Sequence, residues 1–122
     1  MKGGKTNLLG RWGEERVAEW LRGKKYRIVA ANWRCRFGEI DLIAEDEKHI
    51  CFTEVKLRKN DGFAQAREFV DARKQERIKT AAQLYLSQNP TGLQPRFDVA
   101  EVYAPEGTAT SKPEIHYIIN AF

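Results

Sequence analysis

The alternation of apolar and polar residues divides the first half of the chain into one helix and three strands. Apolar positions at helical spacing predict a helix over 9–23, where a glycine ends the pattern. Three β-rich runs follow at 26–33, 39–44 and 49–56, separated by short polar turns. Because short turns join antiparallel neighbours, we expect these strands to form an antiparallel meander.

The second half of the pattern predicts one more helix and two more strands. Residues 57–70 are polar and aperiodic, which is typical of a mobile loop. Asp71 can cap a helix over 72–87, and strands are predicted at 94–102 and 115–119. Since the fourth strand follows a helical crossover, we expect it to run parallel to a neighbour.

Composition adds bounds to this picture. A chain of 122 residues with 42% hydrophobic and 31% charged residues is typical of a globular protein with one core. The order α-β-β-β-α-β-β predicts a single mixed α/β domain over 1–122, a sheet flanked by helices, with residues 1–6 flexible.

The net charge of +4 favours an anionic partner only weakly. No secretory signal begins the chain, and no uncharged run approaches the ~20 apolar residues of a membrane span, so we expect a cytoplasmic protein without a membrane partner.

The predicted second and third strands carry charges where a core strand would be apolar. If the two strands pair through their short turn, Asp41 and Glu54 come together on one face of the sheet. Two adjacent carboxylates raise each other's pKa unless a cation lies between them. Oxygen ligands suit Mg²⁺ or Mn²⁺ better than zinc.

Lys56 lies two residues after Glu54 on the same strand face. An ammonium there could orient a water or stabilise charge that develops on a phosphate. Asp41, Glu54 and Lys56 therefore outline a site for phosphodiester hydrolysis. The alternative is a solvated strand face with a surface ion pair, worth ~0–1 kcal/mol to stability.

These residues also resemble a known signature. Asp41, a hairpin and then Glu54-Val55-Lys56 look like the PD-(D/E)xK nuclease motif, with Ile40 in place of the proline. Further blocks resemble the YraN-like family of small bacterial proteins: Gly13-Glu14, Asn32 with Arg34, GEIDLIA, FTEVKLR, Lys74-Gln75-Glu76-Arg77 and RFDV. Thr53 departs from that family, which often has valine there. The resemblance covers residues 8–103.

The resemblance implies a fold and an activity. The YraN-like family is described as endonuclease-like and related to archaeal Holliday junction resolvases. Membership would imply a restriction-endonuclease-like mixed sheet flanked by helices, and an endonuclease that uses Mg²⁺ or Mn²⁺ on DNA, with branched DNA among its substrates. By the same resemblance, Glu14 would be a third metal or water ligand. The alternative for Glu14 is a favourable charge early in a helix.

Other charged residues are candidates for contact with the nucleic acid. Lys74 stands on an apolar helix stripe, where a lysine is out of place unless it reaches a phosphate or a carboxylate, and Gln75 would be its companion. Four basic residues bracket the acidic strands and could hold phosphates, or could simply be solvated turn residues. These four are Arg34, Arg36, Arg58 and Lys59.

Three further residues have weaker cases for a role in the site. Glu39 could be an outer ligand, a salt-bridge partner or an exposed residue at a strand start. Asp98, in the RFDV block, is expected to be a structural hydrogen-bond acceptor more than a catalytic group. The tryptophans are expected in the core or in subunit contacts.

Three hypotheses about function follow. The first is a divalent-metal-dependent DNA endonuclease, and the second is a non-catalytic nucleic-acid-binding or adaptor module with a nuclease-like fold. The third is an interaction protein with no nucleic-acid role. Because one domain has room for one site, two opposed cuts in a junction would require a homodimer.

Overall fold

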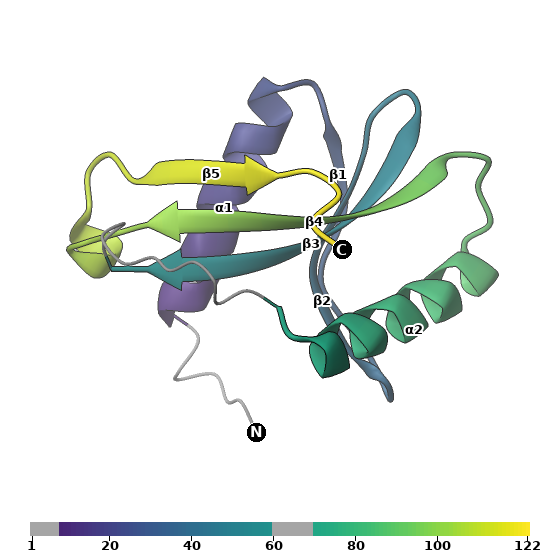
Figure 1. Ribbon diagram of the computed structural model, residues 1–122. Helices are drawn as coiled ribbons and strands as arrows, with labels where there is room; N and C mark the ends of the chain where they lie inside the picture. Colours follow the sequence, from purple (N-terminus) through teal and green to yellow (C-terminus); the bar gives the residue numbers. More distant parts are fainter. Residues whose placement is uncertain (1–7, 60–69) are drawn as a thin grey trace.

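Residues 8–59 and 70–122 form one five-stranded sheet with a helix on each face (Figure 1). A computed structural model describes these residues. The elements are α1 (Leu8–Gly23), β1 (Arg27–Cys35), β2 (Gly38–Glu45), β3 (His49–Arg58), α2 (Ala72–Gln88), β4 (Gln94–Tyr103), the short 3-10 helix η3 (Gly107–Ala109) and β5 (Glu114–Ile118). The predicted order is confirmed. Strand β3 continues to Arg58 rather than ending at residue 56, and the predictions for 1–6 and 60–69 lie outside the described residues.

The strands lie side by side in the order of the sequence, from β1 to β5. Strands β1, β2 and β3 form the expected antiparallel meander. Strand β4 pairs parallel to β3 after the α2 crossover, as predicted, and β5 returns antiparallel to β4. The sheet is therefore mixed.

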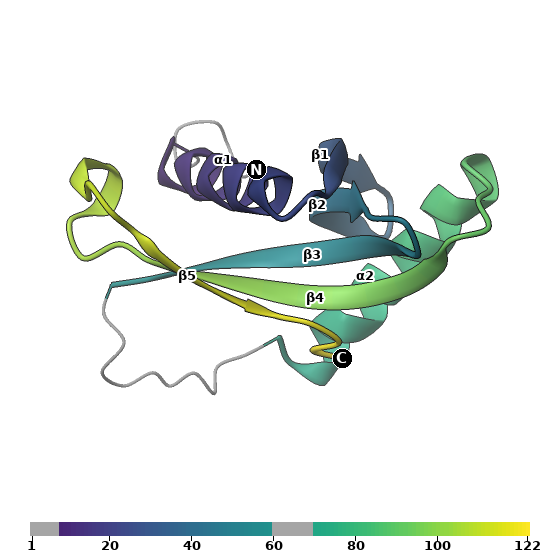
Figure 2. The same cartoon turned by 90° about the horizontal axis from the view of Figure 1, so that it is seen from above.

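The two helices lie on different faces of the sheet, as Figure 2 shows. Each buries its apolar stripe against its own face. Val17 and Leu21 of α1 pack with apolar side chains of β2 and β4 on one face. Ile78 and Tyr85 of α2 pack with Phe52 and its neighbours on the other. A mixed sheet between two helices confirms the predicted fold class and is consistent with a restriction-endonuclease-like fold. Within the described residues, neither helix is long and apolar enough to cross a membrane.

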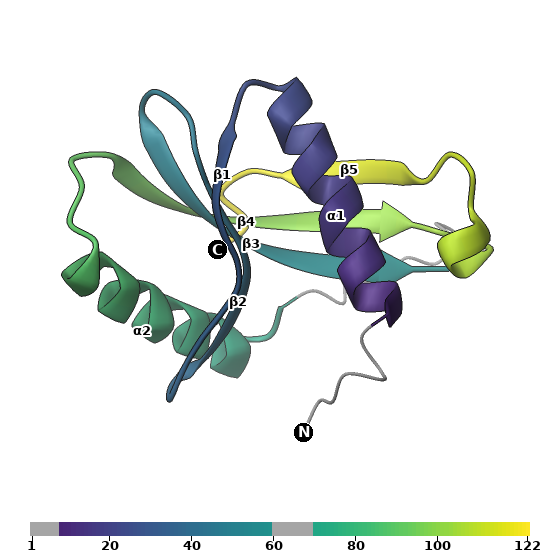
Figure 3. The same ribbon diagram turned by 180° about the vertical axis from the view of Figure 1, so that it is seen from behind.

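Strand β2 changes partners along its length, and this opens a cleft. It pairs with β1 from Gly38 to Glu45, but in the described chain its ladder with β3 runs only from Leu42 to Glu45. The outer half of the β1–β2 hairpin therefore departs from β3 and crosses toward the start of α2 (Figures 1 and 3). A Cβ at Gly38 would lie 3.8 Å from Arg77 Cβ, which shows how closely the hairpin approaches α2.

A buried polar network fastens β4 to β5 and the end of the chain. Asp98, fully buried, accepts hydrogen bonds from Arg96 Nε at 3.0 Å, Tyr117 OH at 2.7 Å and Asn120 N at 3.0 Å. Tyr117 OH also lies 2.8 Å from Thr53 Oγ1 of β3. Asp98 thus has the structural acceptor role expected of it, because its carboxylate satisfies donors from several segments.

The Asp98→Asn variant is expected to lose ~3–5 kcal/mol of unfolding free energy, because it leaves the Arg96 guanidinium buried without a counter-charge. Urea denaturation measures this loss. The matched control is Glu114→Gln, which removes an exposed carboxylate paired with His116 and should cost less than ~1 kcal/mol. Equal urea midpoints for the Asp98 variant and the unmodified protein would refute the structural role.

Candidate active site

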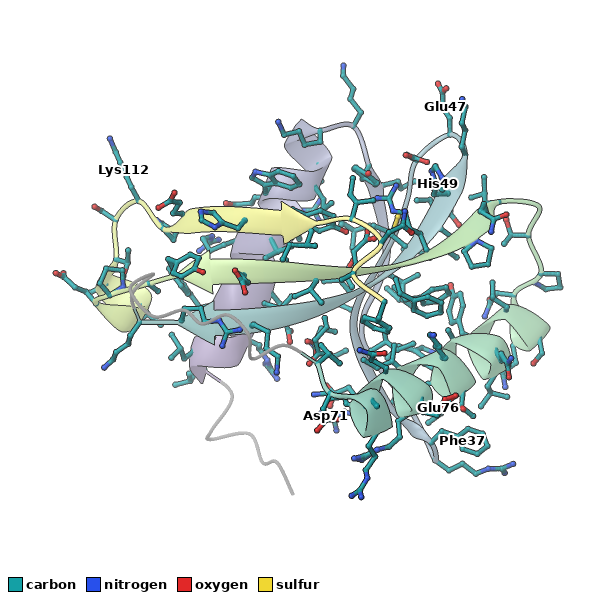
Figure 4. All side chains as sticks on the ribbon, viewed as in Figure 1. Phe37, Glu47, His49, Asp71, Glu76 and Lys112 are labelled. Carbon is teal, nitrogen blue, oxygen red and sulfur yellow. The ribbon has the colours of Figure 1, made fainter. Side chains whose placement is uncertain are left out.

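A cleft with a volume of about 680 Å³ opens where β2 leaves β3. It is lined by residues of α1, β1, β2, β3 and α2. In Figure 4 the labelled Phe37 in the β1–β2 turn, and Asp71 and Glu76 at the start of α2, mark the side on which the hairpin meets α2. The charged residues lining the cleft are Glu14, Glu39, Asp41, Glu54, Arg11, Arg34, Lys74 and Arg77.

The strand register brings Asp41 and Glu54 to the same cleft. The last ladder pair between β2 and β3 is Leu42 opposite Thr53, and the same register continued by one residue puts Asp41 beside Glu54. Beyond Leu42 a side chain rather than the backbone connects β2 to β3, because Asp41 Oδ2 accepts a hydrogen bond of 2.8 Å from Val55 N. Asp41 is therefore fixed to β3 by its own carboxylate.

The surroundings of Asp41 destabilise its charged form. Burial raises the pKa of Asp41, and the nearby charge of Glu54 raises it further, to about 8. The hydrogen bond from Val55 N acts in the opposite direction and only partly offsets these effects. We call Asp41 and Glu54, with the Lys74 ammonium that reaches Glu54, the cleft floor. The ionised form of Asp41 lacks sufficient positive charge around it.

Glu14 reaches the same cleft from α1. Gly13 lets the helix approach β3 closely, since a Cβ there would lie 3.0 Å from Leu57 Cδ2. Glu14 Oε1 accepts a hydrogen bond of 2.9 Å from Asn32 Nδ2. Burial raises the pKa of Glu14, and the Asn32 bond lowers it in part. Glu14 is thus held at the cleft wall by a partner from β1.

Asn32 has an unusual backbone that suits this task. Its φ of 53° lies in the left-handed region, which asparagine tolerates better than most residues. The β1–β2 register on either side, with Ala31 opposite Leu42 and Trp33 opposite Ile40, places Asn32 opposite Asp41. Asn32, Asp41 and Glu54 therefore form one row across three strands.

Lys74 supplies a positive charge to the cleft floor. Its Nζ lies 2.8 Å from Glu54 Oε2. Burial lowers the pKa of Lys74, but the hydrogen bond to Glu54 and the charge of that carboxylate more than offset this, so the pKa is raised overall. The lysine that stands out on its helix stripe thus reaches a carboxylate, one of the two partners expected for it.

Exposed arginines surround the buried and half-buried acids of the cleft. Arg11, Arg34 and Arg77 are exposed residues on α1, β1 and α2, and all three line the cleft. Arg34 Nε also lies 3.8 Å from Glu39 Oε1, a partly exposed carboxylate. The result is an acidic floor with a basic rim.

Arg11, Asn32 and Arg77 line the cleft but were not predicted from the sequence as site residues. For the two arginines a signal existed, because Arg11 precedes Glu14 by three residues and Arg77 follows Lys74 by three. Residues three apart share a helix face. The left-handed backbone of Asn32 has no such signal.

The structure places the other predicted site residues outside the described lining of the cleft. Lys56 is half-buried on the same face of β3 as Glu54. Arg36 is exposed and stacks over Phe37, and Lys59 is exposed just after β3. Arg58 pairs with the buried Glu101 at 3.4 Å, and Gln75 donates to Val70 O at 2.9 Å. The contacts of these residues with nucleic acid stay predictions.

The donor set of the floor fits a magnesium-type cation. Asp41 and Glu54 supply two carboxylates whose repulsion a divalent cation would relieve. Within residues 8–59 and 70–122, no group of three or more His, Cys, Asp or Glu side chains is placed to hold a metal ion. Two carboxylates are enough for Mg²⁺, because this ion commonly binds through one or two carboxylates and keeps several waters or substrate oxygens as its other ligands.

Comparison with known proteins places the chain in a family. Residues 13–102 match the family described as "Uncharacterised protein family UPF0102". The chain belongs to UPF0102. A UPF0102 protein of Syntrophomonas wolfei is 42% identical over 115 residues, which cover 93% of this chain and 96% of that relative. A UPF0102 protein of Nocardia farcinica is 45% identical over 105 residues, covering 85% of this chain and 83% of the relative.

The UPF0102 match confirms the expected resemblance at the level of the family. A further member, from Caldanaerobacter subterraneus, is 42% identical over 124 residues and covers the full length of both chains. The region matched to UPF0102 contains Asp41, Glu54 and Lys74 of the cleft floor and Glu14 at the cleft wall. Arg11, on the rim, lies just before it.

The raised pKa of Asp41 predicts how stability depends on pH. Without metal, the folded state favours the protonated carboxyl up to a pH of about 8, whereas the unfolded carboxyl ionises near 3.8. Asp41 therefore costs stability progressively as pH rises from about 4 to about 8. In EDTA, Asp41→Asn should stabilise the protein by at least ~1 kcal/mol at pH 8 and by much less at pH 4. Thermal melts across this range measure the difference, and an advantage that does not grow with pH would contradict the assignment.

Proposed function

We propose that this UPF0102 protein is a divalent-metal-dependent endonuclease that hydrolyses phosphodiester bonds in DNA, with branched DNA as the first substrate to test. The observation that carries the proposal is the pair Asp41 and Glu54 on the floor of a basic-rimmed cleft, with the pKa of Asp41 raised to about 8. Such perturbed groups in a cleft are typical of functional sites. The resemblance to the PD-(D/E)xK motif and the mixed α/β fold support the same conclusion.

The charges of the cleft match the parts of a nucleic-acid strand. Arg11, Arg34 and Arg77 can hold phosphates on both sides of the one that is cut. Asp41 and Glu54 would hold Mg²⁺ or Mn²⁺, with Glu14 as a third carboxylate nearby. Bound there, the ion would supply Lewis-acid activation of the phosphate and of the attacking water.

The protein's own groups would position and stabilise the reacting centre. Glu14, fixed by Asn32, can orient a water and accept its proton, because burial raises the pKa of its carboxyl. Lys56 keeps the proposed role of stabilising charge on the phosphate. One such site cuts one strand, so cleavage of both strands of a junction would use a homodimer.

Cleavage assays on a panel of DNA structures test the proposal. Junctions, flaps, single strands and duplexes are incubated with Mg²⁺ or Mn²⁺. Asp41→Asn and Glu54→Gln should each lower the cleavage rate by ~10²-fold or more while the protein remains folded, because each removes an oxygen ligand's charge. The control is Glu47→Gln, which makes the same charge change in the exposed β2–β3 turn (Figure 4). Cleavage of every substrate by Asp41→Asn at the unmodified rate would refute the nuclease.

A second candidate function is a non-catalytic nucleic-acid-binding module with this fold. It is favoured by one observation: Lys74 already neutralises Glu54, one of the two carboxylates that would hold the cation. Calorimetry with Mn²⁺ separates the two functions. An absence of Mn²⁺ binding together with intact DNA affinity would favour the non-catalytic binding module and refute the metal-dependent endonuclease.

Both functions predict phosphate contacts at the basic rim. Affinity for DNA should fall steeply with salt, and Arg77→Gln should weaken binding to all sequences and reduce the slope of log K against log salt by ~1. Fluorescence anisotropy at several salt concentrations measures this slope. An affinity that does not change with salt would exclude the rim arginines as phosphate contacts.

A further inference from the structure

The ion pair between Lys74 and Glu54 joins two groups in very different surroundings. The Glu54 side chain is 7% exposed, whereas that of Lys74 is 44% exposed. The carboxylate is therefore fixed in the floor, and the ammonium reaches it from solvent along a flexible stem. The pair can separate by a change of lysine rotamers, with no movement of the strand.

The backbone beneath Lys74 is independent of this ion pair. Asp71 caps α2 by accepting from Lys74 N at 2.9 Å, and Ile78, one turn on, is buried in the core. The helix start therefore stays in place whether or not the ammonium contacts Glu54. Only the side chain has to move.

Lys74 and a divalent cation would compete for the same oxygens. Glu54 is one of the two carboxylates that fit the cation, and Lys74 Nζ occupies its Oε2. Charges of +1 and +2 a few ångströms apart repel strongly in a partly buried cleft. Simultaneous occupation of the Glu54 carboxylate is therefore unfavourable.

We propose that Lys74 is an exchangeable counter-ion of the active site. It neutralises Glu54 while the cleft is free of metal, leaves Glu54 when a divalent cation binds there, and then donates to a phosphate oxygen of the DNA. This inference rests on the proposed function, and it makes metal binding and DNA binding cooperative through one side chain.

The first test is Mn²⁺ affinity by calorimetry in the absence of DNA. Lys74→Gln keeps an amide donor near Glu54 but removes the competing charge, and should bind Mn²⁺ ~10-fold more tightly than the unmodified protein. The matched control is Arg77→Gln, which removes one charge from the same helix and the same cleft. Because the structure gives Arg77 no ion pair with Glu54 among the described residues, we expect a gain of only ~2-fold for it.

The second test is DNA affinity with and without a cation that leaves the DNA intact. A labelled four-way DNA junction is titrated in EDTA and in Ca²⁺, an oxygen-binding cation, and gels verify that the junction is uncut. Lys74→Gln should weaken binding ~5-fold or more in Ca²⁺ and by less than ~2-fold in EDTA, where Lys74 is held by Glu54. Arg77→Gln should weaken binding equally in both.

The outcomes separate the inference from the function on which it rests. Failure of the unmodified protein to bind Mn²⁺ would overturn both. Mn²⁺ binding by the unmodified protein, with equal gains for Lys74→Gln and Arg77→Gln, would overturn the counter-ion alone. Thermal melts verify that each variant is folded.

A second variant, Lys74→Arg, keeps the charge and should bind Mn²⁺ no more tightly than the unmodified protein. A gain in Mn²⁺ affinity equal to that of Lys74→Gln would also overturn the inference.

Discussion

The register between β2 and β3 is the constraint on which both the core and the cleft depend. It places Ile43 opposite Phe52, and both side chains pack beneath α2. The same register, continued by one residue, brings Asp41 to Glu54. A slip of one residue would turn Phe52 away from α2 to the opposite face of the sheet, so the apolar packing forces the two carboxylates together. In the cleft, the burial of Asp41 and its repulsion by Glu54 together raise the pKa of Asp41.

The surrounding charges are arranged in depth. Carboxylates lie on the floor, where burial strengthens electrostatic interactions, and arginines lie on the rim, where they remain hydrated. Lys74 connects the two levels, because its stem begins on α2 and its ammonium ends on Glu54. A uniformly basic cleft would attract a polyanion but offer nothing to hold a divalent cation, and a uniformly acidic one would repel the strand.

The fold was largely predictable from the sequence, and the contacts within the cleft were not. Hydrophobic period, the Asp71 cap and the crossover before β4 are local signals, and each is found in the structure. Period two also fixes the face on which Lys56 lies, but it says nothing about where β2 leaves β3, and this departure decides which side chains border the cleft. The pairing of Lys74 with Glu54 joins residues 20 positions apart on a helix and a strand, so no local pattern encodes it.

The parallel pairing of β3 with β4 also sets the order in which the cleft can be completed as the chain folds. The β1–β2–β3 meander closes through short turns, whereas β4 can join β3 only after the whole α2 crossover is present. On a growing chain, Asp41 and Glu54 therefore meet before Lys74 arrives. The early meander carries the acidic pair without the Lys74 ion pair, and the docking of α2 both covers Phe52 and brings the Lys74 ammonium to Glu54. The same helix thus closes this side of the core and supplies the counter-charge of Glu54.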